Sequence, residues 1–195
     1  GGLDLLDLMK EGLLQPRRIM NLRGIAGLDH IVEEKDGSLR LGALVTIAQV
    51  ASSPIIHQRY TALADATGNS ASPQIRNVAT LGGNLLQRPR CWYFRSVHHN
   101  CVRKGGETCF AFGGENQYHA IFDQNGCAMV HPSTAATALV ALGAKVVLVN
   151  AEGERREVLL EEFYLLPDKD IHRENDLRSA EILTAVVLPK LAPGI

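Results

Sequence analysis

Four cysteines, the only ones in the chain, fall within one stretch of the sequence: Cys91, Cys101, Cys109 and Cys127. Thiols grouped in this way indicate one bound centre rather than scattered core residues. Their spacing, Cys-x9-Cys-x7-Cys-x17-Cys, matches neither the paired Cys-x2-Cys of zinc ribbons nor the tight run of bacterial ferredoxins. The pattern alone therefore leaves open a structural zinc site, an iron–sulfur cluster, two disulfides or ordinary buried thiols.

The residues around these cysteines are short of negative charge. No acidic residue occurs between Asp65 and Glu107, and the basic residues of this interval are Arg76, Arg88, Arg90, Arg95, Arg103 and Lys104. Zinc or a cluster on four thiolates carries about two negative charges, so basic neighbours would stabilise either centre. The same run could equally be a solvated loop face. Histidines that could replace a thiolate at a zinc ion are His98, His99, His119 and His131.

Two glycine pairs predict close approach of the backbone to a ligand. One lies in Thr80-Leu81-Gly82-Gly83-Asn84, just before the first cysteine. The other, Gly1-Gly2, precedes a helix-like apolar spacing through residues 5–9, and the N-terminus of a helix is a natural anion site. The sequence therefore predicts a metal or cluster beside a cofactor loop.

The remaining pattern predicts a mixed α+β fold. Asp36-Gly37 between two apolar runs indicates a hairpin, and Thr46 with Gln49 forms a capping box for a short helix. Residues 85–131 show neither a helical nor a strand period, which is typical of a functional loop. The other expected elements are strands over 17–22, 144–150, 156–160 and 181–188, a helix from Pro54 toward Thr67, and a helix capped by Ser133 or Thr134.

Composition limits the classes of protein that are possible. With 195 residues and 46% apolar content, the chain can form one or two compact lobes, and no apolar run is long enough to indicate membrane insertion. A formal net charge of -1 argues against general nucleic-acid binding. Because the chain starts at Gly1 without a methionine, we interpret it as a fragment or trimmed product.

Three motifs, in order, give the chain a resemblance to the FAD-binding subunit of molybdenum hydroxylases, the family of xanthine dehydrogenase, carbon monoxide dehydrogenase and aldehyde oxidoreductase. Gly1-Gly2-Leu3-Asp4-Leu5-Leu6 stands where the family has Ala-Gly-Gly-Thr-(Asp/Asn)-Leu, and Thr80-Leu81-Gly82-Gly83-Asn84 matches its Thr-x-Gly-Gly-Asn loop. The four-cysteine stretch with His131-Pro132-Ser133 resembles the cluster-bearing variant in the flavin subunit of bacterial periplasmic aldehyde oxidoreductase. The resemblance covers essentially the whole chain.

The resemblance implies an FAD-binding fold of the PCMH type, with two α/β subdomains and an inserted cysteine-rich loop. Residues 1–50 would form the first subdomain, truncated at its N-terminus, and residues 51–190 the second, with the iron–sulfur insertion at 85–131. The family's C-terminal domain would be absent.

The same resemblance implies two cofactors and no catalytic residue in this chain. A [4Fe-4S] cluster would be bound by Cys91, Cys101, Cys109 and Cys127. FAD would be bound by Gly1, Gly2, Leu3, Asp4, Leu5, Thr80, Gly82, Gly83, Asn84 and Thr134. Two of these FAD-site positions depart from the family: Leu3 replaces a threonine, and Thr134 replaces an aspartate that hydrogen-bonds FAD.

The implied function is that of an oxidoreductase subunit that passes electrons from iron–sulfur centres to FAD and an external acceptor. Substrate would be oxidised at a molybdenum cofactor in a large partner subunit, with [2Fe-2S] centres in a small one. Nucleic acid and membrane are not expected partners. The implied location is the bacterial cytoplasm, or the periplasm by co-export with a partner subunit. The alternative is a non-enzymatic interaction module stabilised by zinc, in which the glycines only turn the chain.

Overall fold

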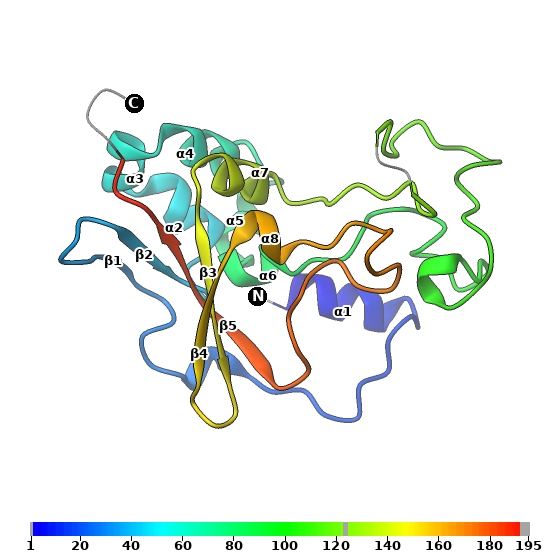
Figure 1. The fold of residues 1–195 in the computed structure, drawn as a ribbon, viewed down its shortest axis with the longest axis horizontal. Helices are drawn as coiled ribbons and strands as arrows, with labels where there is room; N and C mark the ends of the chain where they lie inside the picture. Colours follow the sequence, from blue (N-terminus) through cyan, green and yellow to red (C-terminus); the bar gives the residue numbers. More distant parts are fainter. Residues whose placement is uncertain (1, 123–124, 192–195) are drawn as a thin grey trace.

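A five-stranded antiparallel sheet with helices packed against it forms the main part of the structure, a computed structural model that describes residues 2–122 and 125–191 (Figure 1). The strand order is β1-β2-β5-β3-β4. This combination confirms the α+β class. The strands are β1 Ile31–Glu33, β2 Leu39–Gly42, β3 Lys145–Asn150, β4 Arg155–Leu159 and β5 Glu181–Leu188. The helices are α1 Leu3–Lys10, α2 Ile47–Ser52, α3 Pro54–Arg59, α4 Thr61–Gly68, α5 Pro73–Val78, α6 Leu81–Leu85, α7 Thr134–Ala141 and α8 Leu160–Phe163.

The hairpin between β1 and β2 forms as the sequence predicts. Gly37 adopts a φ of 82°, in the left-handed region that glycine enters without steric cost. The Asp36 carboxylate accepts hydrogen bonds from the backbone N–H and the hydroxyl of Ser38, at 2.9 and 2.6 Å. These contacts also hold the pKa of Asp36 below its ordinary value. The turn thus fixes the register in which β1 and β2 pair.

The central strand β5 joins the two halves of the sheet, because β2 and β3 pair with its opposite edges. Its Val186 lies opposite Leu41 on β2 and Val146 on β3. Alternate side chains of these strands are fully buried and form one core with residues of α2, α4, α6, α7 and α8. Strands from both sides of residue 50 therefore share one sheet, and the subdomain boundary at that residue stays a prediction.

Two helix predictions are confirmed and one is wrong in extent. Thr46 and Gln49 form the capping box of α2, and the Ser133 hydroxyl caps α7 by accepting from the Ala136 N–H at 3.0 Å. The helix from Pro54 is divided into α3 and α4 at Tyr60, which leaves helical geometry with φ -138° and ψ 53°. The buried Tyr60 ring is held there by a hydrogen bond from its hydroxyl to the Pro189 carbonyl, at 2.9 Å.

The strand predicted over residues 17–22 is absent from this part of the described chain. The segment is irregular and leads into a short 3₁₀ turn, Leu22–Gly24, in which the Arg23 N–H donates to the Asn21 side-chain oxygen at 3.0 Å. Ile19 and Met20 are exposed, so the apolar side chains of this segment have no sheet face to pack against. Tertiary packing overrides local propensity here.

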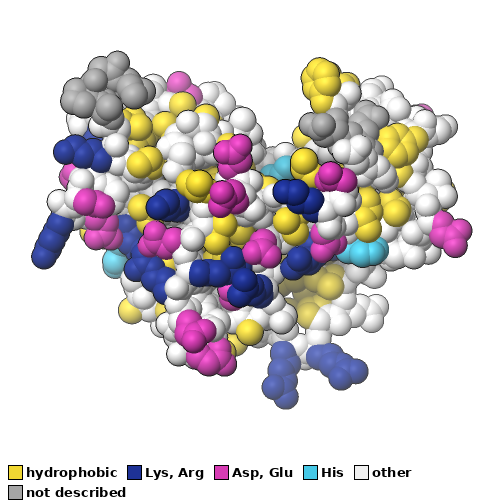
Figure 2. Space-filling model, in the orientation of Figure 1, with side chains coloured by type: hydrophobic (Ala, Val, Ile, Leu, Met, Phe, Trp, Pro, Cys, Tyr) yellow, Lys and Arg dark blue, Asp and Glu magenta, His cyan; other side chains and the backbone are white. Residues whose placement is uncertain are grey.

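Residues 85–131, called the cysteine segment below, extend away from the sheet on the side where α1 lies (Figure 1). Beyond the end of α6, the described part of this segment contains only one regular element, the 3₁₀ turn Val102–Lys104. Leu8 of α1 packs with Phe94 and Cys101 in a second, smaller apolar cluster. Basic and acidic side chains alternate across the middle of the molecular face shown in Figure 2. None of the described helices is long and apolar enough to cross a membrane.

Candidate cofactor pocket and cysteine cavity

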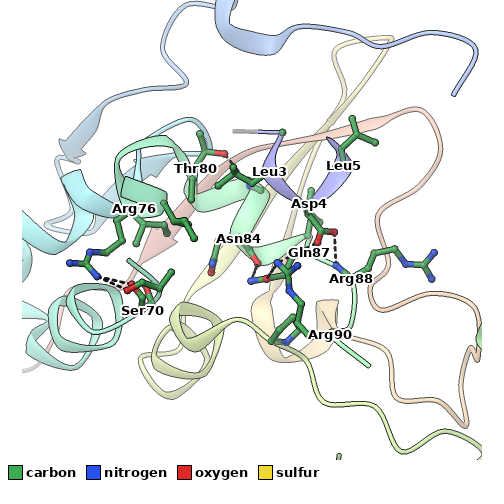
Figure 3. Close-up of a pocket in the computed structure, with 18 of the residues that line it drawn as sticks. Leu3, Asp4, Leu5, Ser70, Arg76, Thr80, Asn84, Gln87, Arg88 and Arg90 are labelled. Atoms are coloured by element: carbon green, nitrogen blue, oxygen red, sulfur yellow. Dashed lines mark hydrogen bonds and ion pairs between the residues drawn. The ribbon is translucent and has the colours of Figure 1, made fainter. Parts of the chain in front are cut away.

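A cavity of about 590 Å³ lies where α1, α5, α6 and the start of α7 meet (Figure 3). This volume is within the range that small-molecule and cofactor sites occupy. Three segments far apart in the sequence contribute to its wall. The predicted site residues that border it are Gly2, Leu3, Asp4, Leu5, Thr80, Gly83, Asn84 and Thr134.

The two neighbouring glycines of α6 have different surroundings. Gly83 borders the pocket, and its N–H donates to the hydroxyl of Thr80, the N-cap residue, at 3.3 Å. Gly82 is buried against Ala43: a Cβ at this position would lie 2.9 Å from the Ala43 Cβ, and its N–H donates to the Ala43 carbonyl. Gly82 therefore allows α6 to pack closely against Ala43, the residue that follows β2. Unlike the other predicted residues of this loop, it does not border the pocket.

Asn84 connects α6 to the start of α7. Its side-chain oxygen accepts a hydrogen bond from the Ser133 hydroxyl at 2.5 Å, and the same hydroxyl caps α7. Thr134, the first residue of α7, follows on the pocket wall. The Asn84 side chain thus stands at the junction of two pocket segments, as Figure 3 shows from the α6 side.

The N-terminus of α1 forms the third side of the pocket. Gly2 begins the helix with a φ of 76°, and Leu3, Asp4 and Leu5 of the first turn border the cavity. The first backbone N–H groups of a helix have no partner within it, so this turn offers donors to an anion. Gly1 lies outside the described residues.

The Asp4 carboxylate is occupied by other parts of the chain. Its Oδ2 accepts a hydrogen bond from the Arg88 backbone N–H at 3.0 Å, and its Oδ1 forms an ion pair with Arg95 at 2.7 Å. Arg90 lies 3.4 Å from Oδ1 as well. Asp4 therefore holds α1 against the beginning of the cysteine segment, which is a structural role beside the predicted contact with cofactor.

Several residues that border the pocket were not assigned to it by sequence reasoning. They include three members of the basic run, and the full set of polar additions is Ser70, Arg76, Gln87, Arg88 and Arg90. Arg76 donates to the carbonyls of Ser70 and Ala71, and Ala71 has a φ of 47°, a conformation that non-glycine residues rarely adopt. The sequence signal for these residues was the interval without acidic side chains, which favours an anionic ligand.

The four cysteines border one small apolar cavity of about 20 Å³, together with Phe94 and Arg103. All four are free thiols: Cys91, Cys101, Cys109 and Cys127. Among the described residues, no group of three or more His, Cys, Asp or Glu side chains is arranged to hold a metal ion. The structure therefore brings the predicted ligands to the same cavity, and their sulfur atoms are not in a ligating arrangement.

The sulfur of Cys91 has a polar neighbour. His119 Nε2 lies 3.1 Å from its sulfur. Burial raises the pKa of the Cys91 thiol, and the backbone N–H groups of Phe94 and Tyr93, which favour the thiolate, act in the opposite direction. A coordinating metal would deprotonate such a thiol outright.

The other candidate histidines do not border this cavity. His99 Nδ1 is 3.1 Å from the Ser96 hydroxyl, and neither His98 nor His99 borders the cavity. His131 packs against Tyr164, with ring centroids 4.4 Å apart, and burial lowers its pKa. Of the four histidines considered as zinc ligands, only His119 lies beside a cysteine sulfur in the described structure.

A family model described as the FAD binding domain in molybdopterin dehydrogenase matches residues 1–191. The chain belongs to this family. The aldehyde oxidoreductase FAD-binding subunit PaoB of Escherichia coli (strain K12) is 39% identical to it over 191 residues, which are 97% of this chain and 60% of that subunit. The carbon monoxide dehydrogenase medium chain of Hydrogenophaga pseudoflava is 36% identical over 85 residues, 44% of this chain and 29% of that one.

Solved structures of the family share the fold. Carbon monoxide dehydrogenase from Hydrogenophaga pseudoflava aligns with a TM-score of 0.67 and 24% identity, over 99% of this chain and 50% of that chain. Reconstituted CO dehydrogenase from Oligotropha carboxidovorans aligns with a TM-score of 0.68 and 21% identity, over 99% and 51%. The chain thus spans about half the length of these solved chains and 60% of PaoB.

The pocket of this FAD-binding domain has the chemistry that a dinucleotide needs. Its wall is largely apolar, which suits aromatic rings, and a helix N-terminus and arginines supply donors for a pyrophosphate. The chemistry of the cysteine cavity's lining also suits an anionic centre, because two buried nitrogen atoms of Arg103, Nε and Nη2, have no hydrogen-bond partner among the described residues.

Proposed function

We propose that the chain is the FAD-binding, electron-transfer part of a molybdenum-containing dehydrogenase of the aldehyde and xanthine type. The observation that carries the proposal is the meeting of three FAD-type motif segments, from α1, α6 and the start of α7, at one pocket of about 590 Å³. Bound FAD supplies the redox chemistry, accepting and passing on electrons, and the protein supplies position and electrostatics.

The chain's own groups divide the work of binding FAD. Backbone N–H groups of Leu3, Asp4 and Leu5 hold the pyrophosphate at the N-terminus of α1. Thr80, Gly83 and Asn84 allow close approach and offer polar contacts from α6, while Thr134 contributes from α7. Arg76 and Arg90, both on the pocket wall, offset the negative charge of the phosphates.

The proposed partners are those of the whole enzyme. A large subunit with the molybdenum cofactor oxidises the substrate, a small subunit with [2Fe-2S] centres delivers electrons, and an external acceptor removes them. The relatives named above support this, since one is an FAD-binding subunit of an aldehyde oxidoreductase and another a chain of carbon monoxide dehydrogenase. The proposed location is the bacterial cytoplasm, or the periplasm by co-export with a partner.

The proposal includes a [4Fe-4S] cluster bound by the four cysteines of the cysteine segment. Three features support it: the thiols are free, they border one cavity, and Arg103 offers unpaired donors to that cavity. The competing proposal is a zinc-stabilised interaction module, which the 3.1 Å approach of His119 to Cys91 favours. Iron, acid-labile sulfide, zinc and flavin analysis of the full protein that contains this chain separates the two. Colourless protein with zinc and no flavin would overturn the electron-transfer assignment.

The FAD site itself is tested with Asn84→Ala, measured by FAD titration of the apoprotein. Loss of the amide should weaken FAD binding by about 1–3 kcal/mol, or about 5- to 150-fold. Ser133→Ala is the matched control: it removes the hydrogen bond to Asn84 and the cap of α7 and leaves the Asn84 amide in place. Equal FAD affinity in wild type and Asn84→Ala would reject this pocket as the flavin site.

The departure at position 134 gives a second test of the same site. Thr134→Asp should tighten FAD binding, because a carboxylate there can form a charge-assisted hydrogen bond to the cofactor. Thr137→Asp adds the same charge to the same helix at an exposed position that does not border the pocket, and it should leave the affinity unchanged. Weaker binding in Thr134→Asp alone would show that position 134 is not the family's aspartate site.

A further inference from the structure

We propose that Arg103 is the charge partner of the group bound by the four cysteines, and that Glu174 holds the Arg103 guanidinium toward that group. The inference rests on the proposed cluster and adds to it a positioning residue outside the ligand set. Arg103 is the middle residue of the 3₁₀ turn Val102–Lys104, which directly follows the ligand candidate Cys101.

The Arg103 guanidinium is buried, and part of it has no hydrogen-bond partner among the described residues. Its side chain is 1% exposed, and its Nη1 donates to Glu174 Oε1 at 2.9 Å. Its Nε and Nη2 are buried and have no hydrogen-bond partner among the described residues. Unpaired buried donors on a charged group are costly, and native structures rarely leave them so. The residue borders the same cavity as the four cysteines, so an acceptor in that cavity would complete its bonding.

The charges around Glu174 do not balance. Its carboxylate, 7% exposed, receives Arg103 and also both Nε and Nη2 of Arg88, at 3.1 and 3.0 Å. Two guanidinium groups thus share one carboxylate. Arg88 is 34% exposed, so water compensates part of its charge, whereas the Arg103 guanidinium is buried and has only a share of the Glu174 carboxylate. The shortfall of negative charge therefore lies at Arg103.

The cysteine cavity is the place where such a charge would lie. Four neutral thiols or two disulfides would offer Arg103 only weak acceptors and no charge. A centre held by four thiolates carries about two negative charges and presents sulfur acceptors. The unpaired N–H groups of Arg103 therefore favour a thiolate-bound anionic centre over reduced or oxidised cysteines alone.

This arrangement has a consequence for redox chemistry. Uptake of one electron by an iron–sulfur centre adds one negative charge, which a nearby cation and N–H donors stabilise. Charge and hydrogen bonds to the sulfurs are among the factors that set the potential of such centres. Arg103 should therefore raise the midpoint potential of the centre, and Glu174, of opposite charge, should lower it.

The test is a redox titration, followed by electron paramagnetic resonance, of the full protein that contains this chain, together with iron and sulfide content. Arg103→Gln should lower the midpoint potential by at least the equivalent of a tenfold change in the reduced-to-oxidised ratio, about 59 mV for one electron. Glu174→Gln should shift it upward. Arg156→Gln is the matched control, because it breaks an arginine–glutamate ion pair with Glu181 at a residue that does not border the cysteine cavity, and it should leave the potential unchanged.

The outcomes separate this inference from the proposed function. Wild-type protein without iron would overturn the cluster itself. Iron-loaded protein whose potential is the same in wild type, Arg103→Gln and Glu174→Gln would overturn only the role of Arg103. If Arg103→Gln does not fold, Arg103→Lys and Glu174→Gln provide the test. The lysine variant keeps the positive charge without the planar donors, so its midpoint potential should shift downward by a smaller amount. An unchanged potential in both variants would reject the inference.

Discussion

The sheet region, strands β1–β5 with helices α2–α8, and the cysteine segment are ordered by different forces. The sheet region buries one continuous apolar core, in which residues such as Leu41, Leu148 and Val186 are fully inaccessible. In the described part of the cysteine segment beyond α6, Phe94 and Cys101 belong to a small apolar cluster, and Tyr118, Ile121 and Phe122 are exposed. The difference shows that apolar burial suffices for the first region and that the second depends on polar anchors and, we propose, on a bound centre.

Two sets of charged contacts anchor the cysteine segment. Arg95, 12% exposed, pairs with Asp4 and Asp7 of α1 and also donates to the carbonyls of Arg88 and Pro89. Arg103 and Arg88 meet Glu174, which precedes β5 in the chain. Charged pairs therefore hold the cysteine segment in place, as buried aliphatic side chains do in the sheet region.

The largest expected effect is the loss of the bound centre. Changing any one of Cys91, Cys101, Cys109 or Cys127 to Ser should lower iron content and expose the cysteine segment to protease, because the proposed cluster would supply much of its order. The sheet region should keep its protection. Iron, sulfide and limited proteolysis of all four variants are the measurements. A variant with full iron and wild-type protection would remove that cysteine from the ligand set, as expected if a histidine such as His119 takes its place.

The complementary change is made in the sheet core. Leu148→Ala should lower the free energy of unfolding by about 2–5 kcal/mol, because it leaves a cavity at a fully buried position of β3. Chemical denaturation measures the loss, and iron content should not change. Leu159→Ala, at an exposed position on the neighbouring strand β4, is the control and should change stability little. Equal effects of the two would contradict the description of the core.

A smaller, local effect is expected at the joint between α1 and the cysteine segment. Arg95→Gln removes the guanidinium that donates to Asp4 and to two carbonyls, at a cost of about 1–3 kcal/mol. Faster amide hydrogen exchange should be confined to α1 and the nearby part of the cysteine segment. Arg155→Gln, which breaks an exposed pair with Glu157 in the sheet region, should leave this exchange unchanged. Uniform exchange across both regions would argue against a separate joint.

The smallest effect concerns an ion pair of the sheet region. The hydrogen bond from Arg156 lowers the pKa of Glu181 from its ordinary 4.5 to about 2. A depressed pKa in the folded state means that the pair's stabilisation is present above about pH 4.5 and is lost as the pH falls toward 2. Glu181→Gln should cost about 1 kcal/mol near neutral pH and flatten this part of the profile. Denaturation at several pH values measures it, and a wild-type profile in the variant would exclude the pair as its source.

Sequence reasoning located the local signals well. The Asp36-Gly37 hairpin, the Thr46 capping box and the start of α7 were all predicted, because each depends on side chains a few residues apart. It failed at residues 17–22, where the exposed Ile19 and Met20 have no sheet to join, and at Tyr60, whose distant contact with Pro189 divides a helix. In the pocket it found the motif residues and missed the contributions of Arg76 and Arg90.

The sequence by itself determined the family, the FAD-type motifs and the grouping of the four cysteines, because these are properties of residue type and spacing. Only the tertiary structure decided that Gly83 borders the pocket while Gly82 packs on Ala43, since two adjacent glycines are equivalent until their neighbours are in place. It also brought Glu174 to Arg103 across 71 residues. Such contacts depend on how the sheet region packs, which no local pattern specifies.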